Sequence, residues 1–123
     1  MPSSDLITTS VTYEEGVAVV TVAGDVDLAT VPTFEAAIAE AVTHNPATLI
    51  VDLSAVDFLA SAGLQALVAS KERISKTADF AVVANGPATS RPIQLTGLDQ
   101  ILSLHPTMAD AMAALDTGSD SAN

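Results

Sequence analysis

Short apolar runs alternate with amphipathic stretches along this chain, a pattern that is typical of an α/β domain. The β-branched run around Ile50 and Val51 predicts a strand over 48–53 that is buried on both faces. Alternating residues over 6–13 and the apolar run over 17–22 are separated by Glu-Glu-Gly, which predicts an antiparallel hairpin. The chain is then expected to leave the strand at Gly24.

Helical spacing predicts a first helix that begins near Thr30 and Pro32 and ends at about Thr43. Its apolar face is expected to consist of residues spaced i, i+4, i+7 and i+8, namely Phe34, Ile38, Ala41 and Val42. A second helix is expected after Ser61, ending at about Lys76.

The remaining apolar segments predict short strands over 80–84 and 101–104. A weaker helix is expected over 89–96, where Pro92 should delay its start or kink it. A final helix is expected over 107–115, with Thr107 as its N-cap.

Together these elements predict one domain over 6–115, with loose tails at 1–5 and 116–123. The fold class is α/β, with a mixed sheet of four to five strands: an opening antiparallel hairpin, then mainly parallel strands, and about four helices. The predicted core residues are Phe34, Ile38, Ile50, Val51, Leu53, Leu67, Val82 and Leu115.

The composition excludes several functional classes. The 123 residues carry 15 acids and 4 bases, a net charge of −11, which disfavours nucleic acid and anionic membranes as partners. Cysteine is absent from the sequence, so thiol catalysis is excluded. No apolar run is long enough to span a membrane, and no secretory signal is recognisable, so we expect a cytoplasmic protein. The bases Lys71, Arg73 and Lys76 are expected either to complement a helix dipole or to form a docking patch.

Ser61 is the residue with the clearest chemical interest, because it lies between the strand over 48–53 and the next helix. Its hydroxyl is expected either to cap that helix or to be modified or contacted by another molecule. The small side chains of Ala60, Ala62 and Gly63 would allow a close approach.

Other candidate chemistry is weaker. His44 and His105 follow or end predicted elements and are expected at the surface, so we expect no enzyme and no cofactor. The carboxylates of Asp25, Asp27, Asp52 and Asp57 do not have the spacing of a calcium loop.

Three stretches of the chain resemble the STAS domains of bacterial anti-sigma factor antagonists. They are Gly24-Asp25-Val26-Asp27-Leu28-Ala29-Thr30, Asp52-Leu53-Ser54 through Phe58-Leu59-Ala60-Ser61-Ala62-Gly63-Leu64, and Leu95-Thr96-Gly97-Leu98-Asp99. The resemblance implies that an anti-sigma factor serine kinase binds the domain, which frees a sigma factor, and phosphorylates Ser61. It also implies a partner surface on or near Asp27, Leu28, Leu59, Ala60, Ala62 and Gly63.

Two positions depart from the family motif, because Ala60 replaces its acidic residue and Ala62 replaces its second serine. Two alternatives therefore stay open. One is an adaptor that docks on a non-kinase partner, such as the ATPase of a lipid transporter. The other is a domain of the same fold that senses a small ligand or nucleotide.

Overall fold

The fold is a mixed sheet covered unequally on its two faces. The computed structural model describes the backbone of residues 7–121 and the side chains of 7–114. The strands are β1 (Ile7–Glu14), β2 (Val17–Val26), β3 (Thr48–Leu59), β4 (Asp79–Val83) and β5 (Leu104–His105), and the helices are α1 (Val31–Val42), α2 (Ser61–Ile74), α3 (Ser90–Leu95), α4 (Asp99–Leu102) and α5 (Met108–Ser121).

The strands lie side by side in the order of the sequence, from β1 to β5. β1 pairs antiparallel with β2, and every later pairing is parallel. The predicted α/β class, the opening hairpin and the parallel remainder are thus confirmed. None of the described helices is long and apolar enough to cross a membrane.

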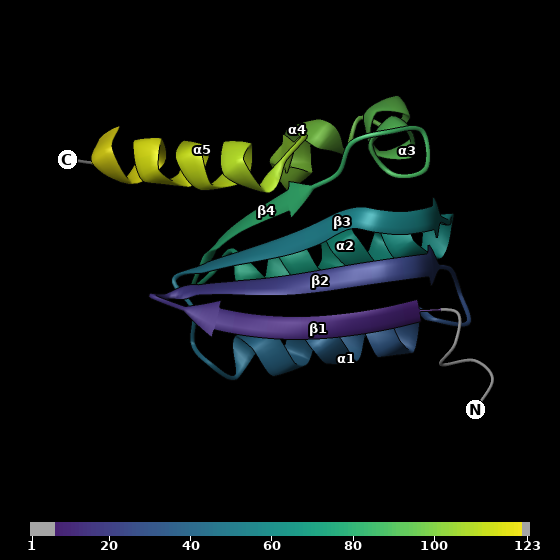
Figure 1. Ribbon diagram of the computed structural model, residues 1–123, viewed down its shortest axis with the longest axis horizontal. Coiled ribbons are helices and arrows are strands. Elements are labelled where there is room, and N and C mark those ends of the chain that lie inside the picture. Colours follow the sequence, from purple (N-terminus) through teal and green to yellow (C-terminus); the bar gives the residue numbers. More distant parts are fainter. Residues whose placement is uncertain (1–6, 122–123) are drawn as a thin grey trace.

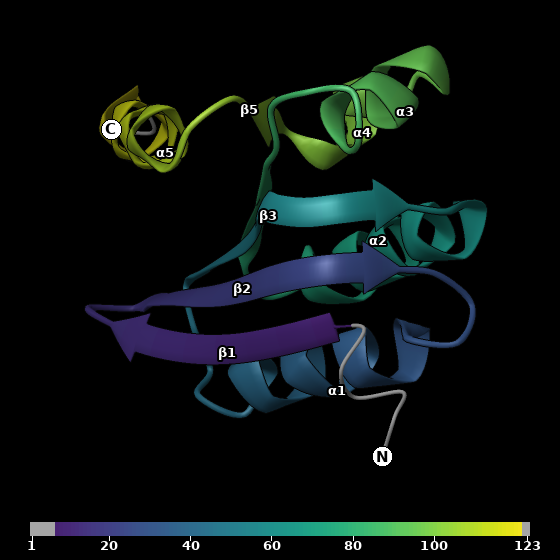
Figure 2. The ribbon, with the colours of Figure 1, turned by 45° about the vertical axis from the view of Figure 1, so that its right-hand side comes forward.

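Helices α1 and α2 lie on one face of the sheet, and α5 lies against the other face beside β4 (Figures 1 and 2). The alternation of β3 fits this arrangement: Leu49, Val51 and Leu53 belong to the main core, whereas Ile50 packs in the smaller cluster with Ala111 of α5. The strand is therefore buried on both faces, as predicted. Seven of the predicted core residues have described side chains, and each is 0% exposed. They are Phe34, Ile38, Ile50, Val51, Leu53, Leu67 and Val82. Leu115 lies outside the described side chains.

Two strands are longer than the sequence pattern predicts. β2 continues past Gly24 to Val26, and β3 continues past Leu53 to Leu59. Their parallel pairing holds through this polar region with register shifts between Thr21 and Ala23 and between Gly24 and Asp25. Irregular pairing lets a strand accommodate turn-forming residues that would otherwise end it.

The helix α1 begins as predicted, with Thr30 as its N-cap residue and Pro32 in the first turn. Phe34, Ile38 and Ala41 are buried, but Val42 was wrongly predicted to be covered, because it is 39% exposed. It stands at the last residue of the helix, beside a hollow between α1 and α2.

The chain between 89 and 105 differs most from the prediction. Residues 101–104 are not a strand, since α4 extends to Leu102 and only Leu104 and His105 form β5. Between them Ser103 has a φ of 54°, which turns the chain. Pro92 neither kinks α3 nor much delays it, because it is the third residue of the helix, where the missing N–H would have no intrahelical acceptor.

Thr107 caps α5 as predicted, since its Oγ1 accepts a hydrogen bond from the backbone N–H of Asp110 at 3.0 Å. The helix continues beyond the expected end at Leu115 and reaches Ser121. Once a helix is nucleated, each added residue fixes the backbone of one residue and gains one hydrogen bond, so extending a helix is easier than starting it.

Replacing Thr107 with alanine is expected to lower the free energy of unfolding by about 1 kcal/mol, because the Asp110 N–H then loses its partner. Chemical denaturation measures this loss. Thr33→Ala is the matched control: Thr33 is exposed on α1 and alanine favours helices, so stability should be unchanged or slightly higher. Equal losses in the two variants would contradict the capping role.

Candidate partner-binding site

The carboxyl ends of β2 and β3 bring two loops together at one edge of the sheet. Val26 pairs with Leu59, and the backbone N–H of Ala60 donates to the carbonyl oxygen of Val26 at 2.8 Å. Asp27 follows β2 directly, and Ala60 and Ser61 follow β3, so these residues leave the sheet at the same edge. The neighbouring ends of the two strands are visible in Figure 2. The fold thus brings together two of the sequence motifs that lie far apart in the chain.

The loop after β2 is held by a compact set of hydrogen bonds. Oδ1 of Asp27 accepts from the backbone N–H groups of Ala29 at 3.0 Å and Thr30 at 3.1 Å. The buried hydroxyl of Thr30 donates to the carbonyl oxygen of Asp25 at 2.8 Å and accepts from the N–H of Asp27 at 2.9 Å. This arrangement leaves Leu28 at the surface, 80% exposed. Asp27 thus shapes the loop, and its contact with a partner stays a prediction.

Ser61 is the first residue of α2, and the N-cap position belongs to Ala60. The sequence-based interpretation of Ser61 as a cap is therefore wrong. The backbone N–H of Leu64 donates to the carbonyl oxygen of Ala60 at 3.1 Å, so the helix begins at Ser61, one residue earlier than expected. No side chain in the described part of the chain caps this helix. The Ser61 side chain is exposed, so its hydroxyl is available to another molecule.

The predicted contact residues around Ser61 differ in accessibility. Ala60 and Ala62 are half-buried, whereas Leu59 and Gly63 are buried and lie beneath the surface. Gly63 has a packing reason for lacking a side chain: a Cβ there would stand 2.7 Å from Cγ1 of Val26 and 2.7 Å from Cδ1 of Leu59. Its absent side chain lets α2 pack closely against the ends of β2 and β3.

A groove of about 420 Å³ adjoins Ser61 and lies between α2 and the segment that joins α3 to α4. Leu64 and Val68 form part of its apolar wall, and Thr96 and Leu98, from the segment between α3 and the start of α4, close the other side. The sequence showed the Leu-Thr-Gly-Leu motif and the Ser61 motif but not that they line one groove.

Two exposed apolar residues near the ends of these elements were not predicted from the sequence. Phe58 on β3 is 53% exposed and Leu95 on α3 is 72% exposed. The sequence alone does not distinguish these two residues from buried apolar ones, because their exposure depends on an outward position on the folded element. Exposed aromatic and aliphatic side chains of this kind are common at protein–protein interfaces.

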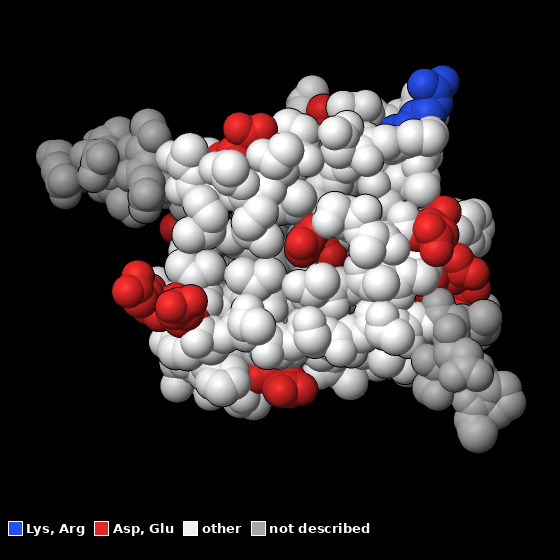
Figure 3. All heavy atoms as spheres, viewed as in Figure 1, with Lys and Arg blue, Asp and Glu red and all other residues white. Residues whose placement is uncertain are grey.

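The other candidate chemistry is not assembled. Within the described residues, no group of three or more His, Asp or Glu side chains is placed to hold a metal ion. His44 is exposed and stacks on Tyr13 with ring centroids 5.0 Å apart. On the face seen in Figure 3, acidic groups lie around the rim and also near the centre, and basic atoms occupy one corner near α3.

Residues 9–111 match the STAS domain family. The chain belongs to this family. It is 45% identical over 118 residues to the anti-sigma-F factor antagonist RsfB of Mycobacterium tuberculosis, covering 96% of this chain and 97% of that protein. A crystal structure of an anti-sigma factor antagonist from Mycobacterium paratuberculosis superposes with a TM-score of 0.84 at 50% identity, covering 93% of this chain and 96% of that one.

The fold extends to more distant proteins. A protein from Thermotoga maritima described as a putative anti-sigma factor antagonist has a TM-score of 0.77 at 20% identity, with 86% of this chain and 92% of that chain covered. At this identity the likeness concerns the fold alone. The STAS resemblance drawn from the three sequence motifs is therefore confirmed by independent sequence and structural similarity.

Proposed function

We propose that this protein is an anti-sigma factor antagonist, which binds an anti-sigma factor through the surface around Ser61 and Leu28. Its 45% identity to one such antagonist and 50% identity to another support this role. The observation that carries the proposal is the exposed Ser61 on the first turn of α2, beside the loop that presents Leu28.

The regulatory step proposed here is phosphorylation of Ser61 by an anti-sigma factor that is itself a serine kinase. A phosphate adds about −1.5 to −2 charges at neutral pH. The domain can tolerate this charge, because the N-terminus of α2 interacts favourably with an anion by roughly 0.3–1 kcal/mol. A partner surface fitted to a neutral hydroxyl and to Leu28 would instead have to desolvate the charge, so the complex should dissociate.

Ser61→Asp is expected to weaken binding to the cognate anti-sigma factor by at least about tenfold, which corresponds to about 1.4 kcal/mol. Ser61→Ala should bind as the wild type does and accept no phosphate. Because Ser61 is not the cap, the alanine variant should also retain its stability. Isothermal titration measures binding, and mass spectrometry after incubation with ATP locates the phosphate.

Ser75→Asp is the matched control, since Ser75 is exposed at the opposite end of the same helix. It adds the same charge and should change the affinity by less than about twofold, a difference of about 0.4 kcal/mol. Wild-type affinity in Ser61→Asp would refute the binding surface. Phosphate on another hydroxyl would refute the regulatory step while leaving the antagonist role intact.

A further inference from the structure

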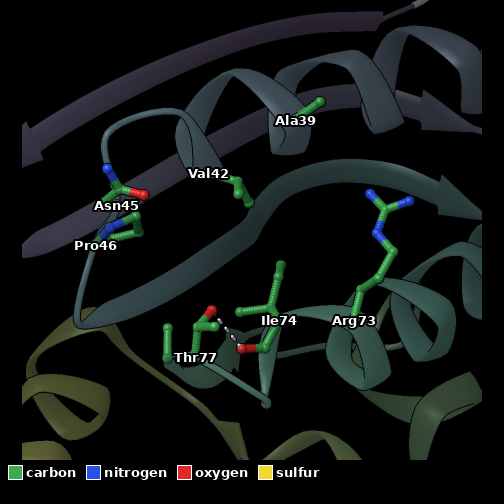
Figure 4. A pocket seen from close by; sticks show the side chains of 8 residues that line it. Ala39, Val42, Asn45, Pro46, Arg73, Ile74 and Thr77 are labelled. Atoms are coloured by element: carbon green, nitrogen blue, oxygen red, sulfur yellow. Dashed lines mark hydrogen bonds between the residues drawn. The ribbon is translucent and has the colours of Figure 1, made fainter.

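A hollow of about 360 Å³ lies between the C-terminal ends of α1 and α2, away from the groove beside Ser61. Its walls are mainly apolar and include Val42 and Ile74, which point into it from the two helices (Figure 4). Pro46 closes one side. This volume falls within the range of about 300–1,000 Å³ that is usual for small-molecule sites.

Val42 is 39% exposed, although its side chain is apolar. This residue continues the apolar stripe of α1, and the other members of that stripe are fully buried. The stripe extends one position beyond the elements that cover it, so an apolar surface of α1 is left facing the hollow. An apolar ligand seated there would complete its burial.

One full charge lines the hollow. The Arg73 side chain extends from α2 toward α1 (Figure 4), and the amide of Asn45 lies at the far side. Arg73 belongs to the group formed with Lys71 and Lys76, three of the 4 bases in a chain of net charge −11. Arg73 therefore places a positive charge in the wall of the hollow, where it can attract a small anion.

We propose that this hollow binds a small monocarboxylate with a short hydrocarbon or aromatic body. The guanidinium of Arg73 would hold the carboxylate through paired N–H···O hydrogen bonds, a geometry that suits arginine. The body would lie against Val42 and Ile74. A single negative charge fits better than a phosphate dianion, because residues from the C-terminal ends of α1 and α2 line the hollow and helix C-termini carry partial negative charge.

The hollow and the proposed partner surface lie at opposite ends of α2. Ser61 and Arg73 are separated by about 18 Å along the helix, at a rise of about 1.5 Å per residue. Carboxylate binding can therefore be measured on the isolated protein, and its failure would leave the antagonist proposal untouched.

Titration of octanoate into the isotope-labelled full chain, followed by amide NMR, tests the site. We expect saturable shifts at Asn45, Ile74 and Thr77, and at least about tenfold weaker binding of 1-octanol, which lacks the charge. Acetate, which lacks the hydrocarbon body, should give no saturable shift at these residues. Octylamine, with the opposite charge, should also fail to bind.

Two variants separate the charge from the apolar wall. Arg73→Gln should reduce octanoate affinity to that of octanol, whereas Lys76→Gln, which removes the same charge outside the hollow, should change it by less than about twofold. Ala39→Phe, at an exposed residue lining the hollow, should reduce binding of octanoate and octanol alike. These residues are exposed, so the variants should remain folded.

Several results would overturn the proposal. One is the absence of saturable shifts at these amides up to about 10 mM octanoate, a limit equivalent to a binding free energy weaker than about −2.7 kcal/mol. Equal effects of Arg73→Gln and Lys76→Gln would show general attraction to the basic group and no defined site. Equal binding of octanoate and octylamine would show adsorption of hydrocarbon without recognition of the carboxylate.

Discussion

Ile50→Ala is expected to lower the free energy of unfolding by about 2–5 kcal/mol, because it leaves a cavity that the surrounding structure fills only in part. Ile50 is 0% exposed and is the largest fully buried residue of the cluster beneath α5. Its buried neighbours there are Ala81, Val83 and Ala111, which are too small to close the gap. Chemical denaturation monitored by circular dichroism measures the loss.

The same variant should loosen α5 more than α1 or α2. The cluster with Ile50 holds α5 through Ala111 and the half-buried Met108, whereas the main core lies on the opposite face of the sheet. Amide hydrogen exchange should therefore accelerate in α5 under conditions where α1 remains protected.

Two controls calibrate this result. Ile50→Val removes one methylene at the same site and should cost about 0.5–1.5 kcal/mol. Val42→Ala removes apolar volume at a residue that is 39% exposed, and it should cost less than about 0.5 kcal/mol. A loss below about 1 kcal/mol for Ile50→Ala would mean that α5 does not seal this face of the sheet.

Gly63→Ala is expected to lower the free energy of unfolding by about 2 kcal/mol, although alanine favours a helix by about 1 kcal/mol relative to glycine. The added Cβ would lie 2.7 Å from Cγ1 of Val26 and 3.3 Å from its carbonyl oxygen. That oxygen accepts a hydrogen bond from the backbone N–H of Ala60, so the backbone of Val26 and the start of α2 cannot move apart without breaking this bond. Thermal and denaturant unfolding measure the change.

A double-mutant cycle identifies the clash as the cause. Val26→Ala removes the Cγ1 atom that the new Cβ would meet, at the cost of a cavity of its own. The loss in Gly63→Ala/Val26→Ala should therefore be clearly smaller than the sum of the two single losses. Additive losses would assign the effect of Gly63→Ala to something other than this contact. Since Gly63 sets the position of α2, the single variant should also weaken anti-sigma factor binding through displacement of Ser61.

The sequence by itself determined the features that depend on local pattern. The β-branched run 48–53, the Glu-Glu-Gly turn after Tyr13 and the cap at Thr107 each gave a correct element, because side-chain period and capping chemistry act within a few residues. The position of Ser61 between a strand and a helix, and the order of the three STAS motifs, were likewise visible in the chain.

Only the tertiary structure decided where those elements end and which motifs meet. β3 runs through polar residues to Leu59 because β2 supplies hydrogen-bond partners there, and the N-cap of α2 is Ala60 and not Ser61. The exposure of Val42 likewise depends on where the covering elements stop. Strand pairing and the burial of a helix face by other elements both join residues that lie far apart in the chain. The periodicity of a single segment carries no information about such long-range partners.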